Sequence, residues 1–173
     1  MKKIMILVIV IVTLAVVIGL FGQTFTYVGA DKCAFCHKTD KQGQQYPIWK
    51  ASAHASSFAA LSSPQAADCA TPMGVKDPVN DPKCLKCHSP LADKAPELKA
   101  EGVTCEVCHG PGSEYKKLSV MKDKAEAVKN GLILYADPDA IKTKCLTCHA
   151  SAHNFTFDFA AYWNKIKHTI PKS

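Results

Sequence analysis

A five-residue pattern, Cys-x-x-Cys-His, occurs four times in this chain of 173 residues and limits what the chain can fold into. The copies read CAFCH, CLKCH, CEVCH and CLTCH, and they begin at Cys33, Cys84, Cys105 and Cys145. Two thiols one helical turn apart can form thioether bonds to the two vinyl groups of one haem, and the adjacent histidine can then bind its iron. The pattern therefore predicts four sites of covalent haem attachment, which we number motifs 1 to 4 in chain order.

Zinc binding and disulfides are the alternatives for the cysteines. Paired Cys-x-x-Cys sequences bind zinc in ribbons, but a ribbon gives no reason for a histidine after every pair. The ninth cysteine, Cys69, has no such histidine, and we interpret it as a free thiol; an intermolecular disulfide or haem ligation stays open. The predicted attachment residues are Cys33, Cys36, Cys84, Cys87, Cys105, Cys108, Cys145 and Cys148, and the predicted proximal iron ligands are His37, His88, His109 and His149.

Little protein is available to surround four haems. After the first two dozen residues about 150 remain, the length of one ordinary domain. We therefore expect the haems themselves to form the core of a compact multihaem cytochrome c, mostly α-helical with extensive coil and no significant sheet. The predicted organisation is a leader over residues 1–24 and a tetrahaem domain over residues 25–173.

Helix signals are clearest in four segments, 46–61, 120–131, 137–149 and 158–170. Apolar residues at helical spacing mark the first, and Gly131 is placed to end the second. Asp137 and Asp158 are placed as N-caps of the other two. Residues 62–82 are rich in Pro, Asp and Gly, which predicts a loop.

The amino terminus carries a targeting signal. Lys2 and Lys3 precede an apolar stretch, residues 4–21, that is interrupted only by Thr13 and Gly19. A cleaved signal peptide and an uncleaved membrane anchor both stay open, because the stretch is longer than a usual signal core and just meets the length of a spanning helix. Both interpretations put the haem domain in the periplasm or on the outer face of the cytoplasmic membrane.

The formal charge of +6 does not indicate nucleic-acid binding, because no basic run is interleaved with aromatic residues. Each haem also brings two propionates, which offset the lysines. We therefore expect the lysines to solvate the surface and to pair with propionates.

The sixth ligand of each iron decides whether that haem carries electrons or binds small molecules. Beyond the motif histidines the chain has three others, His54, His153 and His168, which are the candidate distal ligands. Three histidines cannot complete four irons. Met121 is a weaker candidate for the remaining position, since a methionine there more often packs in a core, and Met73 is weaker still.

Four stretches, YVGADKCAFCH, IWKASAHASSFAAL, GVTCEVCHGPGSEY and CLTCH, resemble the tetrahaem cytochrome c-554 family of periplasmic electron carriers. The resemblance covers nearly all the chain from Tyr27 onward. It implies that His54 is a distal ligand, that the haems stack in close, nearly parallel pairs, and that one of the four irons can lack a sixth protein ligand. Relatives can carry a distal histidine after the segment GPGSEY, whereas this chain has none there before Met121.

We therefore expect an electron carrier rather than an enzyme, a tetrahaem c-type cytochrome working between redox protein partners. Three alternatives stay open. One is a membrane-anchored cytochrome that oxidises quinol, and another is a reductase of nitric oxide, hydroxylamine or a similar ligand at an open haem. The third is a subunit of a self-associated filament, in which a neighbouring chain supplies the missing ligand.

The first prediction concerns stoichiometry. Because each of the eight motif cysteines belongs to a Cys-x-x-Cys-His unit, we expect the purified chain to carry four covalent haems, as measured by intact-protein mass. A mass corresponding to three haems or fewer, or to bound zinc, would contradict the haem interpretation of all four motifs.

Overall fold

Each Cys-x-x-Cys-His motif forms the last five residues of a helix. The four helices, α2, α6, α7 and α10, span Ala30–His37, Pro82–His88, Cys105–His109 and Pro138–His149. In a helix, residues three apart share a face, so the two cysteines of each motif lie one above the other. Because each helix ends at the motif histidine, the backbone is free to turn away directly after it.

The computed structural model describes residues 24–150 and 156–168, and every regular element in these two ranges is helical. The mostly α-helical fold class is therefore confirmed, and the described residues contain no strand. The other α-helices are α3 Gln45–Lys50, α4 Ser57–Ala60, α5 Pro64–Ala70, α8 Leu118–Met121, α9 Lys124–Lys129 and α11 Phe159–Ile166. Three short 3-10 helices are η1 Asp40–Gln42, η2 Thr71–Met73 and η3 Pro96–Glu101.

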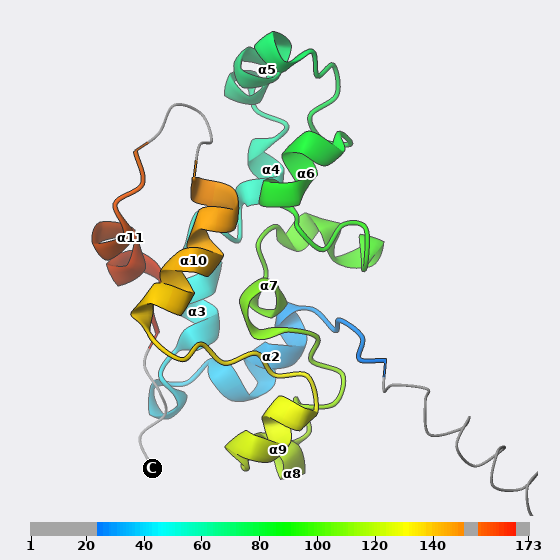
Figure 1. The fold of residues 1–173 in the computed structure, drawn as a ribbon. Helices are drawn as coiled ribbons and strands as arrows, with labels where there is room; N and C mark the ends of the chain where they lie inside the picture. The colour runs from blue at the N-terminus through cyan, green and yellow to red at the C-terminus, as the bar shows by residue number, and fades with distance from the viewer. Residues whose placement is uncertain (1–23, 151–155, 169–173) are drawn as a thin grey trace, which may run out of the picture.

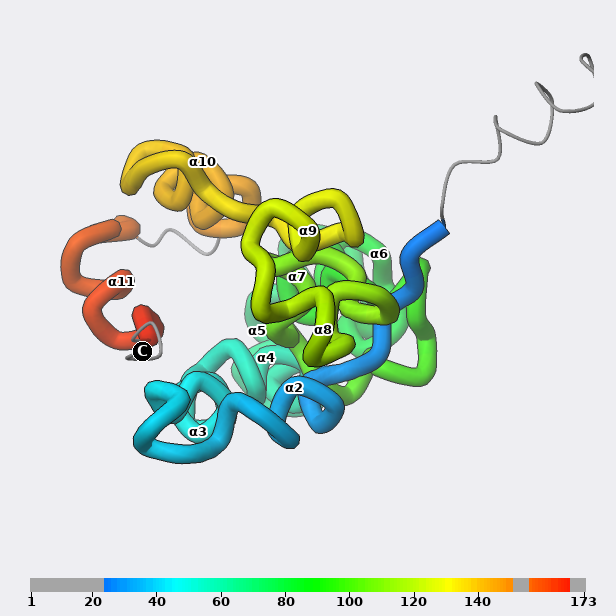
Figure 2. Tube along the Cα trace, turned by 90° about the horizontal axis from the view of Figure 1, so that it is seen from below, coloured from blue at the N-terminus to red at the C-terminus, as the bar shows by residue number. Residues whose placement is uncertain are grey.

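Two of the motif helices, α2 and α7, lie in the middle of the molecule, whereas other helices extend to its ends. In Figure 1, α5 lies at the end opposite α8 and α9, with α2 and α7 between them. The helix of motif 4, α10, lies beside α11 along one side in both Figure 1 and Figure 2. Segments far apart in the sequence are thus brought next to the central motifs.

The apolar core of the described chain is thin. Its main cluster contains Leu61, Ala70, Val75 and Cys84, and the other buried hydrophobic residues include several alanines. Large apolar side chains instead lie exposed, among them Phe35 of motif 1 at 74%. A protein interior is normally close-packed with large apolar side chains. A core this small is what we expect where haems, rather than side chains, fill the interior.

Two of the predicted helices are confirmed with their caps. Asp137 accepts a hydrogen bond from the backbone N–H of Ala140 at 2.8 Å and begins α10, which runs into motif 4. Asp158 accepts from Ala161 N–H at 3.1 Å and begins α11. In both cases the aspartate satisfies a backbone donor that the first helical turn leaves unpaired.

The predicted helix over residues 46–61 is wrong as a single element, because it is broken into α3 and α4 by a turn that contains His54. Serine side chains compete with helical hydrogen bonds in this stretch. Ser52 Oγ donates to Trp49 O at 2.7 Å, and Ser57 Oγ to His54 O at 2.8 Å. His54 is therefore held in a turn and not in mid-helix.

Three further expectations about local structure are corrected. The predicted loop over residues 62–82 contains α5, whose N-cap Ser63 accepts from Ala66 N–H at 3.2 Å, with Pro64 at the first helical position. The predicted helix over 120–131 is divided into α8 and α9, because Asp123 caps the second of them. The last helix ends at Ile166, so His168 lies beyond it.

The predicted leader falls almost entirely on residues 1–23, which lie outside the described ranges. Within residues 24–150 and 156–168, none of the helices has both the length and the hydropathy needed to cross a membrane. The choice between signal peptide and anchor stays a prediction.

Two glycines with positive φ give a matched test of backbone strain. Gly110, directly after motif 3, has φ 79° and ψ 176°, a region that only glycine adopts, and an added Cβ would lie 2.4 Å from Gly131 O. Gly74 has φ 69° and ψ 20°, and its added Cβ would meet nothing within 4 Å. We expect Gly74→Ala to lower the free energy of unfolding by about 1–2 kcal/mol. Gly110→Ala should lower it by about 2 kcal/mol more, because strain and clash add.

Denaturant unfolding of the haem-loaded protein, followed by far-ultraviolet circular dichroism, measures both variants. Equal losses of stability at the two positions would show that the turn after motif 3 can move away from the segment at Gly131.

Candidate haem-binding site

Two of the motif histidines are oriented through their Nδ1 atoms. His88 Nδ1 lies 2.8 Å from the backbone oxygen of Ser57, and His37 Nδ1 lies 3.3 Å from Gln45 Oε1. A histidine that donates from Nδ1 to an oxygen leaves the lone pair of Nε2 available to a metal and fixes the ring orientation. Both rings are thus held in the form that a proximal iron ligand requires.

His149 of motif 4 faces a histidine from a distant part of the chain. Its ring centre lies 6.2 Å from that of His54, at an interplanar angle of 40°. Phe157 stacks on the His149 ring, with ring centres 4.6 Å apart and an interplanar angle of 9°. Burial and the nearby His149 lower the pKa of His54, and burial lowers that of His149, so both rings favour the neutral, ligating form.

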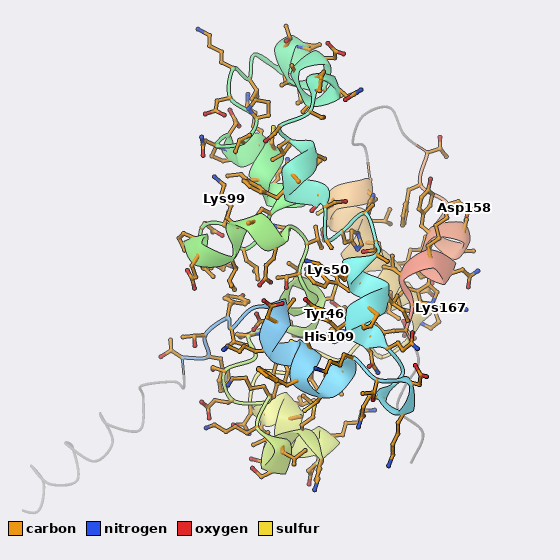
Figure 3. The ribbon with its side chains drawn as sticks, turned by 180° about the vertical axis from the view of Figure 1, so that it is seen from behind. Tyr46, Lys50, Lys99, His109, Asp158 and Lys167 are labelled. Carbon is orange, nitrogen blue, oxygen red and sulfur yellow. The ribbon has the colours of Figure 1, made fainter. Side chains whose placement is uncertain are left out.

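His109 of motif 3 has a similar neighbour. Its ring centre lies 5.8 Å from that of His168, at an interplanar angle of 42°. Figure 3 shows His109 near the centre of the molecule. Burial, followed by the charges of His168 and His37, lowers the pKa of His109 to about 4. Its imidazole is therefore neutral at physiological pH.

The spacing of both histidine pairs fits an iron between the rings. A metal–imidazole bond is about 2.0–2.1 Å long and the nitrogen lies roughly 1.2 Å from its ring centre, so two imidazoles on opposite sides of one metal have centres about 6.5 Å apart. The 6.2 Å separation is close to this value, and the 5.8 Å separation is somewhat shorter. Rings in direct stacking contact are closer, as the His149–Phe157 pair shows.

Motifs 1 and 3 lie against each other through their first cysteines. Cys33 and Cys105 are within hydrogen-bonding reach, and this contact, together with burial, raises the pKa of the Cys33 thiol. The proximity of His37 to His109 agrees with the same arrangement. The attachment sites on α2 and α7 therefore form one pair.

Motifs 2 and 4 form a second pair. Burial and contact with Cys148 raise the pKa of Cys87 to about 11, and Cys148 Sγ lies 3.9 Å from the backbone oxygen of Lys86. The two pairs meet at motif 3, where the pKa of Cys108 is raised by burial and by Cys145 and Cys148 of motif 4. In space the motifs therefore follow the order 1, 3, 4, 2.

The described residues show neither a disulfide nor a zinc-type cluster. All nine cysteines are free, and no group of three or more His, Cys, Asp or Glu side chains in residues 24–150 and 156–168 is arranged to hold a metal ion directly. Haem fits better, because each motif supplies two separate thiols and one imidazole.

The remaining candidate residues are placed as follows. His153 lies outside the described ranges, so its role stays a prediction. Met121 is half-buried as the last residue of α8, and Met73 is exposed at the end of η2. Cys69 is exposed on α5, at the end of the molecule away from α8 and α9.

Sequence reasoning missed the residues that hold His54 in place. Trp49 Nε1 donates to Val103 O at 2.8 Å, and Val103 N–H donates to His54 O at 3.0 Å. Ser57 Oγ lies 2.8 Å from both His54 O and His88 O, so it ties the His54 turn to motif 2. A single serine or valine does not indicate from the sequence that it will hold a distant histidine. Trp49, however, belongs to the stretch IWKASAHASSFAAL that carries the family resemblance.

Comparison with known proteins agrees with the haem interpretation. Residues 32–110 match the family model described as cytochrome c554 and c-prime, a segment that contains motifs 1 to 3 and His54. The chain is also 32% identical over 98 residues to cytochrome c-554 of Nitrosomonas europaea. That alignment covers 51% of this chain and 40% of the relative, so the chain spans about two fifths of the length of the relative it matches.

No solved structure matches the chain. The fourth motif lies outside the segment that the family model covers. Residues 32–110 of this chain are thus similar to the cytochrome c554 and c-prime family, and the relative matched over 98 residues is a cytochrome c-554.

Proposed function

We propose that this chain is a tetrahaem electron carrier that works between redox partners outside the cytoplasm. The observation that carries the proposal is the pairing of two motif histidines with two histidines from distant segments, at ring-centre separations of 6.2 Å and 5.8 Å. The confinement of all four motifs to helix ends supports four equivalent attachment sites.

Each group in the site then has a role. The eight motif cysteines hold the haems, and the four motif histidines bind iron on the proximal side. His54 is the distal ligand opposite His149, and His168 is the distal ligand opposite His109. Haem c bound at these sites supplies an iron that alternates between ferric and ferrous states.

The spatial order 1, 3, 4, 2 supports a continuous row of sites. The cysteines of motifs 1 and 3 and those of motifs 4 and 2 are in contact, and Cys145 and Cys148 lie close enough to Cys108 to raise its pKa, so electrons have only short gaps to cross. The ends of the row are motif 1 on α2 and motif 2 on α6. We infer that donor and acceptor proteins approach these two ends.

The predicted leader supports a place outside the cytoplasm, in the periplasm or on the outer face of the cytoplasmic membrane. An uncleaved leader would keep the carrier at the membrane, and a cleaved one would release it. The chemistry proposed for residues 25–173 is the same in both cases.

The supply of histidines leaves one iron with a different environment. If His54 and His168 serve motifs 4 and 3, the irons at His37 and His88 share one remaining histidine, His153. At least one of these two irons therefore needs methionine, water, a group from another chain, or no sixth ligand. An open position would let this haem bind small ligands.

The next prediction tests the two distal ligands. We expect His54→Ala and His168→Ala each to convert one low-spin haem to high spin, because a strong-field imidazole is lost, while four haems stay attached. Electron spin resonance of the ferric protein measures spin state, and intact mass measures attachment. The double variant should lose two low-spin signals, since the two residues serve different irons.

Replacement of a proximal ligand is the matched control. His149→Ala should disturb haem attachment at motif 4 as well as spin state, because it belongs to the attachment signature. Unchanged spectra in both distal variants would contradict the assignment of His54 and His168 as iron ligands, on which the proposal rests.

A further prediction concerns the irons at motifs 1 and 2. We expect a minor high-spin ferric signal in the unmodified protein and binding of carbon monoxide by the ferrous protein, because one sixth position is open or held by water. If Met121 fills that position, the signal should be absent and should appear in Met121→Ala. If a second chain fills it, the signal should grow on dilution. Four bis-histidine haems in a monomer would contradict the histidine count.

A further inference from the structure

Glu106 is a buried acid that the proposed electron-transfer role does not use. It stands between the two cysteines of motif 3, and only 1% of its surface is exposed. Glutamate is seldom buried this completely without a partner. Its surroundings therefore indicate what the residue does.

Three backbone N–H groups converge on the Glu106 carboxylate. Gly112 donates at 2.6 Å and Gly29 at 2.8 Å, while Val28 N–H lies 3.1 Å and 3.0 Å from the two oxygens. Two of these donors precede motif 1 and the third follows motif 3. A second acid, Glu101, accepts from the N–H of Ala30 at 2.8 Å.

The turn after motif 3 is shaped around this carboxylate. A Cβ added at Gly112 would lie 3.0 Å from Glu106 Oε1 and 3.1 Å from a methyl carbon of Val28. The chain before motif 1 also pairs with this turn, because Ser113 N–H donates to Thr26 O at 3.1 Å. Glu106 thus joins the entry of motif 1 to the exit of motif 3.

No cation neutralises Glu106 within the described ranges. The ion pairs formed there join Lys117 to Glu114 and Lys129 to Glu126, both on the surface. Backbone dipoles satisfy the carboxylate but leave its net charge in place. In a buried environment that charge acts over longer distances than it would in water.

The influence of this charge extends to both neighbouring motifs. After the Cys105 contact and burial, Glu106 is among the causes that raise the pKa of Cys33 in motif 1. The Glu106 charge also acts to raise the pKa of Cys105 of motif 3, against the Cys33 contact that lowers it. After burial and Cys33, it is a further cause of the raised pKa of Tyr115, whose hydroxyl donates to Gly110 O at 2.9 Å.

We propose that Glu106 is a positioning residue that fixes motif 1 against motif 3 and, through its buried negative charge, lowers the reduction potentials of the haems attached there. A ferric haem carries one more positive charge than a ferrous haem. A fixed carboxylate nearby therefore stabilises the ferric form, and reduction becomes harder. The inference rests on the haem attachment at motifs 1 and 3 proposed above.

The chemistry of the site explains why a carboxylate is needed. Both oxygens accept hydrogen bonds, so an amide of the same shape would present its NH₂ group to a backbone N–H. Glu106→Gln therefore removes the charge and part of the hydrogen bonding. Glu106→Asp keeps the charge but is too short to keep all three contacts.

The experiment compares these two variants with Glu97→Gln, which makes the same charge change at an exposed position. Potentials of individual haems come from redox titration followed by electron spin resonance. Hydrogen exchange is measured at the amides of Val28, Gly29 and Gly112. Intact mass counts the haems, so a failure of haem attachment is seen separately from a failure of this inference.

We expect Glu106→Gln to raise the potentials of one or two haems and Glu97→Gln to leave all of them near their original values. Glu106→Asp should keep the low potentials. Exchange at the three amides should become about tenfold faster or more in both Glu106 variants, because their acceptor is lost or withdrawn. Potentials and exchange rates in Glu106→Gln that match those of Glu97→Gln would overturn the proposal.

A second variant keeps the test decisive if Glu106→Gln does not accumulate. Glu101→Gln removes the charge of the second acid, which accepts from one backbone N–H and also acts to raise the pKa of Cys33 and Cys105. It should raise the same potentials by a smaller amount. Unchanged potentials in Glu101→Gln would then count against electrostatic control of this haem pair.

Discussion

The contact between histidines from distant segments is the constraint on which this structure depends. His149 meets His54, and His109 meets His168, each time at a distance that suits a single iron. The apolar side chains cannot replace these contacts, because the largest buried cluster is small and includes a cysteine of motif 2. The helices are accordingly short, and their positions follow from the motifs that they carry.

The backbone around the motifs serves the same purpose. The turn at His54 is fixed by Trp49, Ser57 and Val103, so a residue near motif 3 helps to place His54, the proposed distal ligand of motif 4. Likewise, the Glu106 carboxylate ties the approach to motif 1 to the exit from motif 3. Polar contacts to the backbone thus do much of the positioning that large apolar side chains do in other domains.

Much of this arrangement could be predicted from the sequence, because the haem motif is local. The helix caps Asp137 and Asp158 and the stop at Gly131 are also local signals, and the structure bears them out. The break at His54 could not be foreseen, since it depends on Val103, which is distant in sequence. The capping role of Ser63 was not recognised, because the surrounding Pro and Asp residues indicated a loop. The pairing of motifs needed three-dimensional information.

The spatial order of the motifs differs from their order along the chain, and this affects how the protein is made. If the chain crosses a membrane with its amino end leading, motif 1 emerges long before motif 3, and His168 emerges after all four motifs. Contacts of such large sequence separation close large loops and form late. If the chain is exported and carries haems as proposed, the first haems can be attached while the chain is still open, before the contacts of His168 form. Maturation factors would act on an extended chain, before these pairs form.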